Sequence, residues 1–432
     1  MCFISKVKLQ LLAAICKKAI YYFANYFSCS WLSYYNNYTL RFVPKQLHLF
    51  CVSFIVFQAV CFAGAGSVYA QLNNKALQRE IPVQVENANE IRFRLHLLGF
   101  SKNNEYFNEI ADGYTLFGYH FIPTITYNYK EILQLEAGAL IWKDFGSSGF
   151  QSIEPILTAK IKKDNWALIF GTLEGNLNHG YIEPLYDFEN IITDRLENGT
   201  QYIYTSPKVR VDAWIDWNKM IYAFDPDQEQ INGGASTAFE LLRKGGRLGE
   251  GDTTILTLPV QFTAMHRGGQ IDVSDLPLVT WVNAAVGLEA ERELPFRILH
   301  RVYTKNYLLG YKDFSNEYRQ PYQDGYGIYL NIGADTKYQD VMLSYWHGNS
   351  YITELGGDLY QSASTTVTTP DYLQQERRLL ILRLMKDIEL LQGLSLTLRL
   401  EPVLDLDKPK FEFSNALYLK FDTDFFLGKP KQ

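Results

Sequence analysis

This 432-residue chain has no cysteine after residue 61 and no Asp or Glu before residue 70, so its composition changes near residue 70. All five cysteines lie between Cys2 and Cys61, and none follows. No Asp or Glu precedes residue 70, although 47 occur in the whole chain. The part after residue 70 therefore forms no disulfide and performs no thiolate chemistry.

The segment before this boundary has the pattern of an export signal. A secretory signal combines a positive start, an apolar stretch of about 7–15 residues and small residues before the cut. Arg41 and Lys45 supply the charge, Leu49–Phe62 the apolar stretch, and Val68–Ala70 the small residues. We therefore expect residues 1–70 to be leader and signal peptide, with cleavage before Gln71.

Two other interpretations of this segment remain open. A membrane anchor requires about 20 apolar residues, more than this run contains. A lipid attached to Cys61 is the second, but the preceding Gln-Ala-Val is a poor lipidation sequence. Residues 1–44 form an unusually long leader, which suggests an over-extended gene start.

The remaining chain lacks positive charge and long apolar runs. The leader holds six of the 41 basic residues of the chain. The remaining chain therefore has 35 basic and 47 acidic residues, a net charge of −12. This balance argues against a nucleic-acid partner, which requires a basic surface. No segment after residue 70 approaches 20 consecutive apolar residues. If the domain lies in a membrane, it spans the membrane as a β-barrel.

Apolar and polar residues alternate along much of the chain, as in strands with one face toward lipid. In 394–401 the leucines fall on one face, and Ser395, Thr397, Arg399 and Glu401 fall on the other. Segments 91–97, 209–217, 256–263 and 411–422 repeat the pattern. A soluble β-sandwich also alternates, but its strands are usually about 5–6 residues long.

We predict an all-β fold, a transmembrane antiparallel β-barrel of about 16 strands, with 14 as the alternative. A periplasmic N-terminal segment (71–89) precedes the barrel (90–426), and a C-terminal tail (427–432) follows. The predicted strands are 90–100, 113–126, 131–142, 151–162, 166–174, 200–217, 220–226, 235–243, 253–266, 278–292, 296–312, 324–335, 340–351, 375–389, 394–404 and 411–426. The pair 220–226 and 235–243 is the weakest. Short and long connections alternate, which is typical of outer-membrane barrels.

With these strands, the chain resembles the porin-like outer-membrane β-barrels of Gram-negative bacteria over residues 71–432. The resemblance implies an aqueous lumen, passive passage of small hydrophilic solutes, and contact with outer-membrane lipid and the barrel assembly machinery. It also allows a homotrimer. One departure is the end of the chain, where Phe425-Phe426 is followed by six further residues instead of closing the chain on an aromatic residue.

In porins of sixteen strands the third external loop folds inward and narrows the pore. By that resemblance, segment 175–199 is the candidate constriction. Its candidate residues are His179, Tyr181, Glu183, Asp187, Glu189 and Asp194. Such an acidic constriction concentrates cations, because low-dielectric walls focus the field. A solvated surface loop is the alternative interpretation.

Charged residues within the strands form the second candidate set. An Arg on the lipid face at mid-depth costs about 2–4 kcal/mol, so these residues must face the lumen if the strands span. They are Arg92, Arg94, Arg210, Asp212, Asp216, Arg399 and Glu401. Selecting a solute and pairing with one another are both open roles for them, and mutual pairing is the default.

Catalytic, cofactor and metal motifs are not evident in the sequence. No His-Glu-x-x-His or other metal-ligand spacing occurs. Outer-membrane lipid hydrolases use a Ser/His pair on the outer face of the barrel, but Ser344 and His347 are three residues apart and face opposite sides of a strand. We expect a porin-like channel without enzymatic activity. The alternatives are an outer-membrane lipid hydrolase and a non-conducting structural or binding barrel.

Overall fold

A computed structural model describes residues 74, 77–79, 81, 83, 85–245 and 252–430. The predicted leader and cleavage site, residues 1–70, lie outside the described residues. No helix among the described residues is long and apolar enough to cross a membrane.

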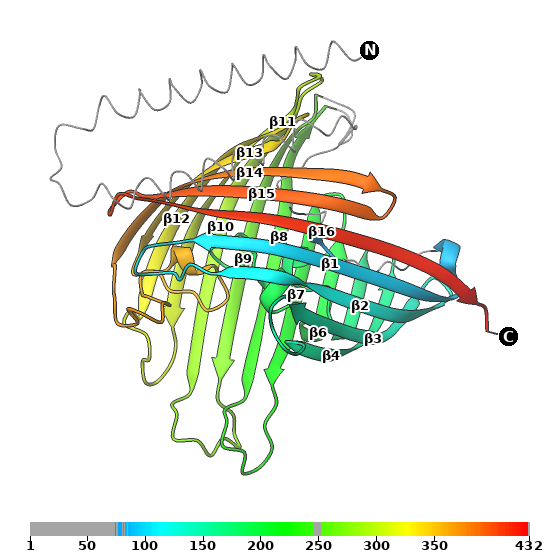
Figure 1. Cartoon of the computed structure of the whole chain (residues 1–432), viewed down its shortest axis with the longest axis horizontal. Helices are drawn as coiled ribbons and strands as arrows, with labels where there is room; N and C mark the ends of the chain where they lie inside the picture. The colour runs from blue at the N-terminus through cyan, green and yellow to red at the C-terminus, as the bar shows by residue number, and fades with distance from the viewer. Residues whose placement is uncertain are drawn as a thin grey trace. The chain divides into compact units, whose positions relative to one another are not determined.

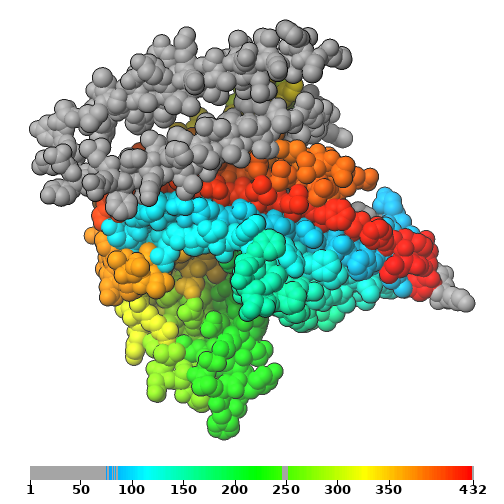
Figure 2. Space-filling view, viewed as in Figure 1, coloured from blue at the N-terminus to red at the C-terminus, as the bar shows by residue number. Residues whose placement is uncertain are grey.

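The described chain forms one closed antiparallel β-barrel (Figure 1). Its strands are β1 (Ile91–Glu105), β2 (Thr115–Tyr129), β3 (Leu133–Asp144), β4 (Ser152–Lys163), β5 (Trp166–Thr172), β6 (Asn198–Thr205), β7 (Val209–Lys219), β8 (Gln230–Lys244), β9 (Thr254–Arg267), β10 (Val279–Glu293), β11 (Leu299–Asp313), β12 (Asp324–Thr336), β13 (Asp340–Asn349), β14 (Glu376–Leu391), β15 (Leu394–Asp405) and β16 (Lys410–Gly428). Each strand pairs with its neighbours in sequence, and β16 closes the barrel on β1, with Ile91 opposite Gly428 and Glu105 opposite Phe413. In Figure 2 the red surface of β16 follows the blue surface of β1.

The helical elements are short. They are η2 (Val85–Asn87), η3 (Asn176–His179), α3 (Asn190–Thr193) and η4 (Asp358–Tyr360). Both η3 and α3 belong to the connection between β5 and β6, and η4 belongs to the connection between β13 and β14.

Alternation along the strands separates an apolar outer face from a polar inner face. Exposed apolar side chains on the outer face include those of Ile125, Leu157, Phe170, Phe262, Leu288, Leu308 and Ile332. Buried polar side chains on the inner face include those of Thr126, Gln134, Thr158, Gln261, Asn283, Asn331 and Ser344. This arrangement suits a barrel with lipid outside and a polar interior. The protein is an outer-membrane β-barrel, as predicted.

The two ends of the barrel differ in their connections. The longest connections, 173–197 and 350–375, leave the same end, which is called here the long-loop end. The connections 130–132, 164–165, 206–208, 337–339 and 392–393 lie at the other, short-turn end. In outer-membrane barrels long loops are extracellular and short turns periplasmic.

The number of strands agrees with the prediction, but two strand assignments were wrong. Segment 200–217 is two strands, β6 and β7, joined by a turn at Ser206–Lys208. The Ser206 N–H donates to the carbonyl of Val209 at 2.8 Å, and Pro207 has no N–H for a ladder. Segment 220–226 lies outside the strands, with the side chain of Phe224 88% exposed. Its apolar residues therefore reflect an exposed loop.

The segment before β1 enters the barrel. Leu77 and Ile81 are each only 1% exposed, and the Arg79 guanidinium pairs with Glu136 of β3 at 3.0 Å. These described residues lie against the inner wall, a placement that the predicted periplasmic segment 71–89 did not include. Apolar side chains four residues apart explain the difference, because burying each stabilises by about 1.5–3 kcal/mol.

Candidate functional site

The connection between β5 and β6, residues 173–197, lies inside the barrel and is called here the inward loop. It contacts the wall at several strands. The His179 imidazole meets Asp212 of β7 at 3.0 Å, and the Tyr181 hydroxyl donates to the carbonyl of Phe262 in β9 at 3.0 Å. Gly180, at φ 74°, turns the chain between these two residues in a conformation that favours glycine. The inward loop therefore lies against the inner wall of the barrel, and its role as a pore constriction stays a prediction.

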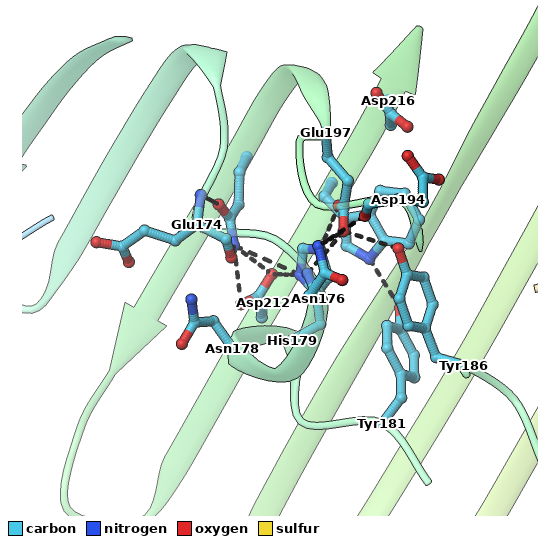
Figure 3. Close-up of polar contacts among 12 residues, drawn as sticks. Glu174, Asn176, Asn178, His179, Tyr181, Tyr186, Asp194, Glu197, Asp212 and Asp216 are labelled. Atoms are coloured by element: carbon cyan, nitrogen blue, oxygen red, sulfur yellow. Dashed lines mark hydrogen bonds and ion pairs between the residues drawn. The ribbon is translucent and has the colours of Figure 1, made fainter. Parts of the chain in front are cut away.

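His179 is the centre of the polar contacts in Figure 3. Its two ring nitrogens lie 2.7 Å from Glu197 and 3.0 Å from Asp212, and its ring stacks on Trp214 at 4.6 Å. The Tyr186 hydroxyl donates to Glu197 at 2.7 Å. Burial lowers the pKa of His179, but the two carboxylates outweigh burial and raise the pKa to about 10. At neutral pH the imidazole is therefore an imidazolium that fixes the inward loop to β7.

Glu183 connects the inward loop to the opposite wall. Arg383 of β14 and Arg399 of β15 both donate to its carboxylate, and the Tyr360 hydroxyl donates to it at 2.9 Å. Glu401 accepts from Arg383 at 2.7 Å and from Arg399 at 2.8 Å. Burial raises the pKa of Glu183, but the two guanidinium groups outweigh burial and lower the pKa below its ordinary value. Two cations and two anions thus balance in a buried cluster.

Two cavities meet at this cluster. The larger, of about 1010 Å³, opens toward the short-turn end and is lined by Lys160, Tyr181 and Tyr303 among others. The smaller, of about 60 Å³, lies toward the long-loop end beside Lys102. Glu183 lines both cavities, so its side chain lies where they adjoin.

The other acidic residues predicted in the inward loop have different partners from Glu183. Asp187 donates its N–H to the carbonyl of Leu355 at 2.7 Å, and burial followed by Glu189 raises the pKa of Asp187 to about 8. Glu189 pairs with Lys102 of β1 at 3.2 Å. Burial followed by Glu197 raises the pKa of Asp194 to about 6. Asp187 and Glu189 line the smaller cavity together with Glu183, whereas Asp194 lines neither cavity.

The charged strand residues predicted for the wall lie on the inner face of their strands. They are Arg92, Arg94, Arg210, Asp212, Asp216, Arg399 and Glu401. Most of these residues bind protein groups: Arg92 binds Glu90 and Asp424, and Arg210 donates to the carbonyl of Asn178 at 2.5 Å. Their role in selecting a solute stays a prediction.

Some residues of these clusters were not singled out from the sequence. Arg383 follows Leu379, Leu380, Ile381 and Leu382, so β14 is apolar on both faces and shows no alternation. The usable signal was the charge itself, because an Arg at mid-strand must face the lumen. Lys102 also went unnoticed, since only the fold brings it to Glu189.

On the outer face, a histidine and a hydroxyl lie side by side near the long-loop end. The Nδ1 atom of His266 in β9 is 2.9 Å from Oγ1 of Thr280 in β10, and the two residues are directly paired across the strands. Both lie on the same face as Phe262 and Val286, which are exposed. This pair is of the kind that the lipid-hydrolase alternative required, with Thr in place of Ser.

A pocket of about 550 Å³ adjoins this pair. Its lining includes His266, Glu229 and the apolar side chains of Ile231, Ile271 and Leu278. Gly268 and Gly269 also line the pocket and keep it open. By contrast, Ser344 faces the lumen and His347 lies on the outer face, as their spacing predicted. No group of three metal-binding side chains occurs among the described residues.

The solved structures found to be similar to the chain have both low identity and low TM-scores. OccAB4 of Acinetobacter baumannii is 11% identical, with a TM-score of 0.43, over 80% of this chain and 100% of that chain. OpdL of Pseudomonas aeruginosa is 12% identical, with a TM-score of 0.42, over 77% and 99%. OprD of Pseudomonas aeruginosa is 10% identical, with a TM-score of 0.44, over 84% and 100%. No curated protein matches the chain.

Comparison with protein families gives a more specific result. The model of the family described as Lipid A 3'-O-deacylase-type matches residues 83–430, which include every strand of the barrel. This family is named for an enzyme activity, so the prediction that the protein is not an enzyme is wrong. That prediction rested on the absence of a recognisable catalytic motif in the sequence. The chain belongs to the Lipid A 3'-O-deacylase-type family.

Proposed function

We propose that the protein is an outer-membrane lipid hydrolase that removes an ester-linked acyl chain, with its reactive groups on the outer face of β9 and β10. The observation that carries the proposal is the 2.9 Å contact between His266 Nδ1 and Thr280 Oγ1. A hydroxyl becomes an effective nucleophile when an adjacent base takes its proton. The family name supports lipid A as the substrate class.

The adjoining pocket suits an acyl chain. Ile231, Ile271 and Leu278 give it apolar walls, and it is reached from the outer face of the barrel. An acyl chain placed there removes apolar surface from water at about 0.8 kcal/mol per buried CH₂. The ester carbonyl then lies near the strand ends that carry His266 and Thr280.

The reaction proceeds in two balanced steps. Thr280 Oγ1 attacks the ester carbonyl carbon while His266 accepts the hydroxyl proton, and the departing sugar alkoxide takes that proton from His266. Water then attacks the acyl-threonine with His266 as the base, which releases the fatty acid and restores the Thr280 hydroxyl. Glu229 lines the same pocket and contributes negative charge near the imidazolium.

The test is release of fatty acid from lipid A by the refolded full-length protein, followed by mass spectrometry. Thr280→Val and His266→Gln are each expected to slow release by about 10²–10⁴-fold, the usual contribution of acid–base catalysis. Thr237→Val is the matched control, because Thr237 also faces outward and its hydroxyl donates to the carbonyl of Val260 at 2.9 Å. Full activity in Thr280→Val and His266→Gln would overturn the assignment of the site.

A second candidate function is passage of small hydrophilic solutes through the lumen. The supporting observation is that Glu183 lines both the cavity at the short-turn end and the cavity at the long-loop end. A path through the lumen thus requires only that the contacts around this one side chain open. The test is the conductance of the refolded protein in planar bilayers. Stepwise conductance would support passage, and no conductance at any voltage would favour a non-conducting barrel.

A further inference from the structure

We propose that the barrel interior carries a groove for an extended peptide, and that the chain's own segment before β1 is the peptide that fills it. The segment is called here the strap, and its described contact residues are Leu77, Gln78, Arg79 and Ile81. One wall of the groove is the inward loop, and the other is formed by β3 and β4.

Main-chain groups of the strap are bound as in a peptide complex. The carbonyl of Arg79 accepts from the Asn178 side chain at 2.6 Å. The N–H of Ile81 donates to Glu174 at 2.6 Å, and the carbonyl of Ile81 accepts from Lys160 at 2.9 Å. Recognition through main-chain groups is how extended peptides dock, and it tolerates changes of sequence between the pockets.

Alternate side chains of the strap give the groove its specificity. Leu77 enters an apolar cluster that includes Phe188 of the inward loop and Leu98 of β1. Two residues further on, the Arg79 guanidinium pairs with buried Glu136 at 3.0 Å. The groove therefore fits a peptide with two apolar residues four positions apart and a basic residue midway between them.

The strap also fixes the inward loop. The Gln78 side chain donates to the carbonyl of Leu177 at 3.0 Å, and the contact of Asn178 follows at the next residue. These contacts come just before His179, which fixes the loop to β7. If the groove were vacant, Leu177 and Asn178 of the inward loop would lose these contacts with the strap.

Trypsin tests whether the strap stays in the groove, because Arg79 supplies the cleavage site. In the full-length folded protein we expect the bond after Arg79 to resist trypsin while the exposed bond after Lys244 is cut, as read by mass spectrometry. Leu77→Asp removes the apolar anchor and is expected to speed cleavage after Arg79 at least tenfold. Phe224→Asp is the control, since it adds the same charge at a side chain that is 88% exposed and lies outside the strap. Equal rates in all three proteins would overturn the proposal.

A second measurement tests the groove itself. A fluorescent peptide of residues 71–84 is expected to bind the full-length Leu77→Asp protein and not the wild-type protein, whose groove is filled. The same peptide with Arg79→Glu is expected to bind at least tenfold more weakly. Equal binding of the first peptide to both proteins, or no binding to the variant, would refute a peptide groove.

Discussion

At the scale of single residues, His179 holds a buried positive charge that depends on its two flanking carboxylates. Removing the imidazole leaves Glu197 and Asp212 buried without their cation, and breaking a buried pair in this way costs about 3–5 kcal/mol. His179→Gln should therefore lower the free energy of unfolding by this amount at pH 6, measured by urea titration. His300→Gln is the control, because His300 is exposed.

The pH dependence of this contribution follows from the direction of the pKa shift. The pKa of His179 rises from 6.5 to about 10 in the folded protein, so protonation favours folding. The stabilisation is complete below pH 6.5 and is lost as the pH rises through 10. The difference between wild type and His179→Gln should thus shrink from pH 6 to pH 10.5. A constant difference over this range would show that His179 acts through packing alone.

At the scale of elements, the two long connections of the long-loop end support each other inside the barrel. The Tyr351 hydroxyl donates to the carbonyl of Pro184 at 2.8 Å, and the N–H of Gly357 donates to the carbonyl of Glu183 at 3.0 Å. A Cβ on Gly356 would lie 2.2 Å from the Pro184 carbonyl oxygen. The close approach of the two loops therefore requires glycine at this position.

Gly356→Ala is expected to separate the two loops without disturbing the barrel wall. The measurement is hydrogen exchange at residues 183–187, where we expect exchange at least tenfold faster, equivalent to about 1.4 kcal/mol of local opening. Gly310→Ala is the matched control, since a Cβ on Gly310 meets nothing within 4 Å. Unchanged exchange in Gly356→Ala would mean that the loops do not depend on this contact.

Elements with regular alternation could be predicted from the sequence, and the others could not. The alternation in 394–404 located β15, and it placed Arg399 and Glu401 on one face. Segment 200–217 read as one strand because both of its halves alternate, and only the turn at Pro207 divides them. Arg383 meets Glu183 because a loop folds inward, and His266 meets Thr280 because of the register between two strands. Local periodicity encodes neither the register nor the loop, so Arg383 was missed although Glu183 was singled out, and both His266 and Thr280 were missed.

At the scale of the whole molecule, the barrel combines an outer face suited to lipid chemistry with a lumen that is almost closed. The proposed reactive pair, His266 and Thr280, lies outside the wall, and the cluster around Glu183 lies inside it. Because the two sites face opposite sides of the sheet, a substitution in one should leave the other unchanged. Fatty-acid release and conductance are therefore independent measurements on the same protein.

The charge of the inward loop gives the last prediction. Glu183 and Glu189 supply negative charge in the lumen, whereas Asp187, whose pKa is raised to about 8, is mostly protonated at neutral pH. Such charge raises the local concentration of cations. If the lumen conducts, neutralising the three together, as Glu183→Gln, Asp187→Asn and Glu189→Gln, should lower the preference for cations, measured as the reversal potential in a salt gradient. Asp324→Asn is the control, because Asp324 is exposed at the end of β12. Conductance with unchanged selectivity in the triple variant would show that the inward loop does not set the selectivity. Glu183→Gln alone also leaves Arg383 and Arg399 short of one anion, so it should move the preference toward anions further than Asp187→Asn does.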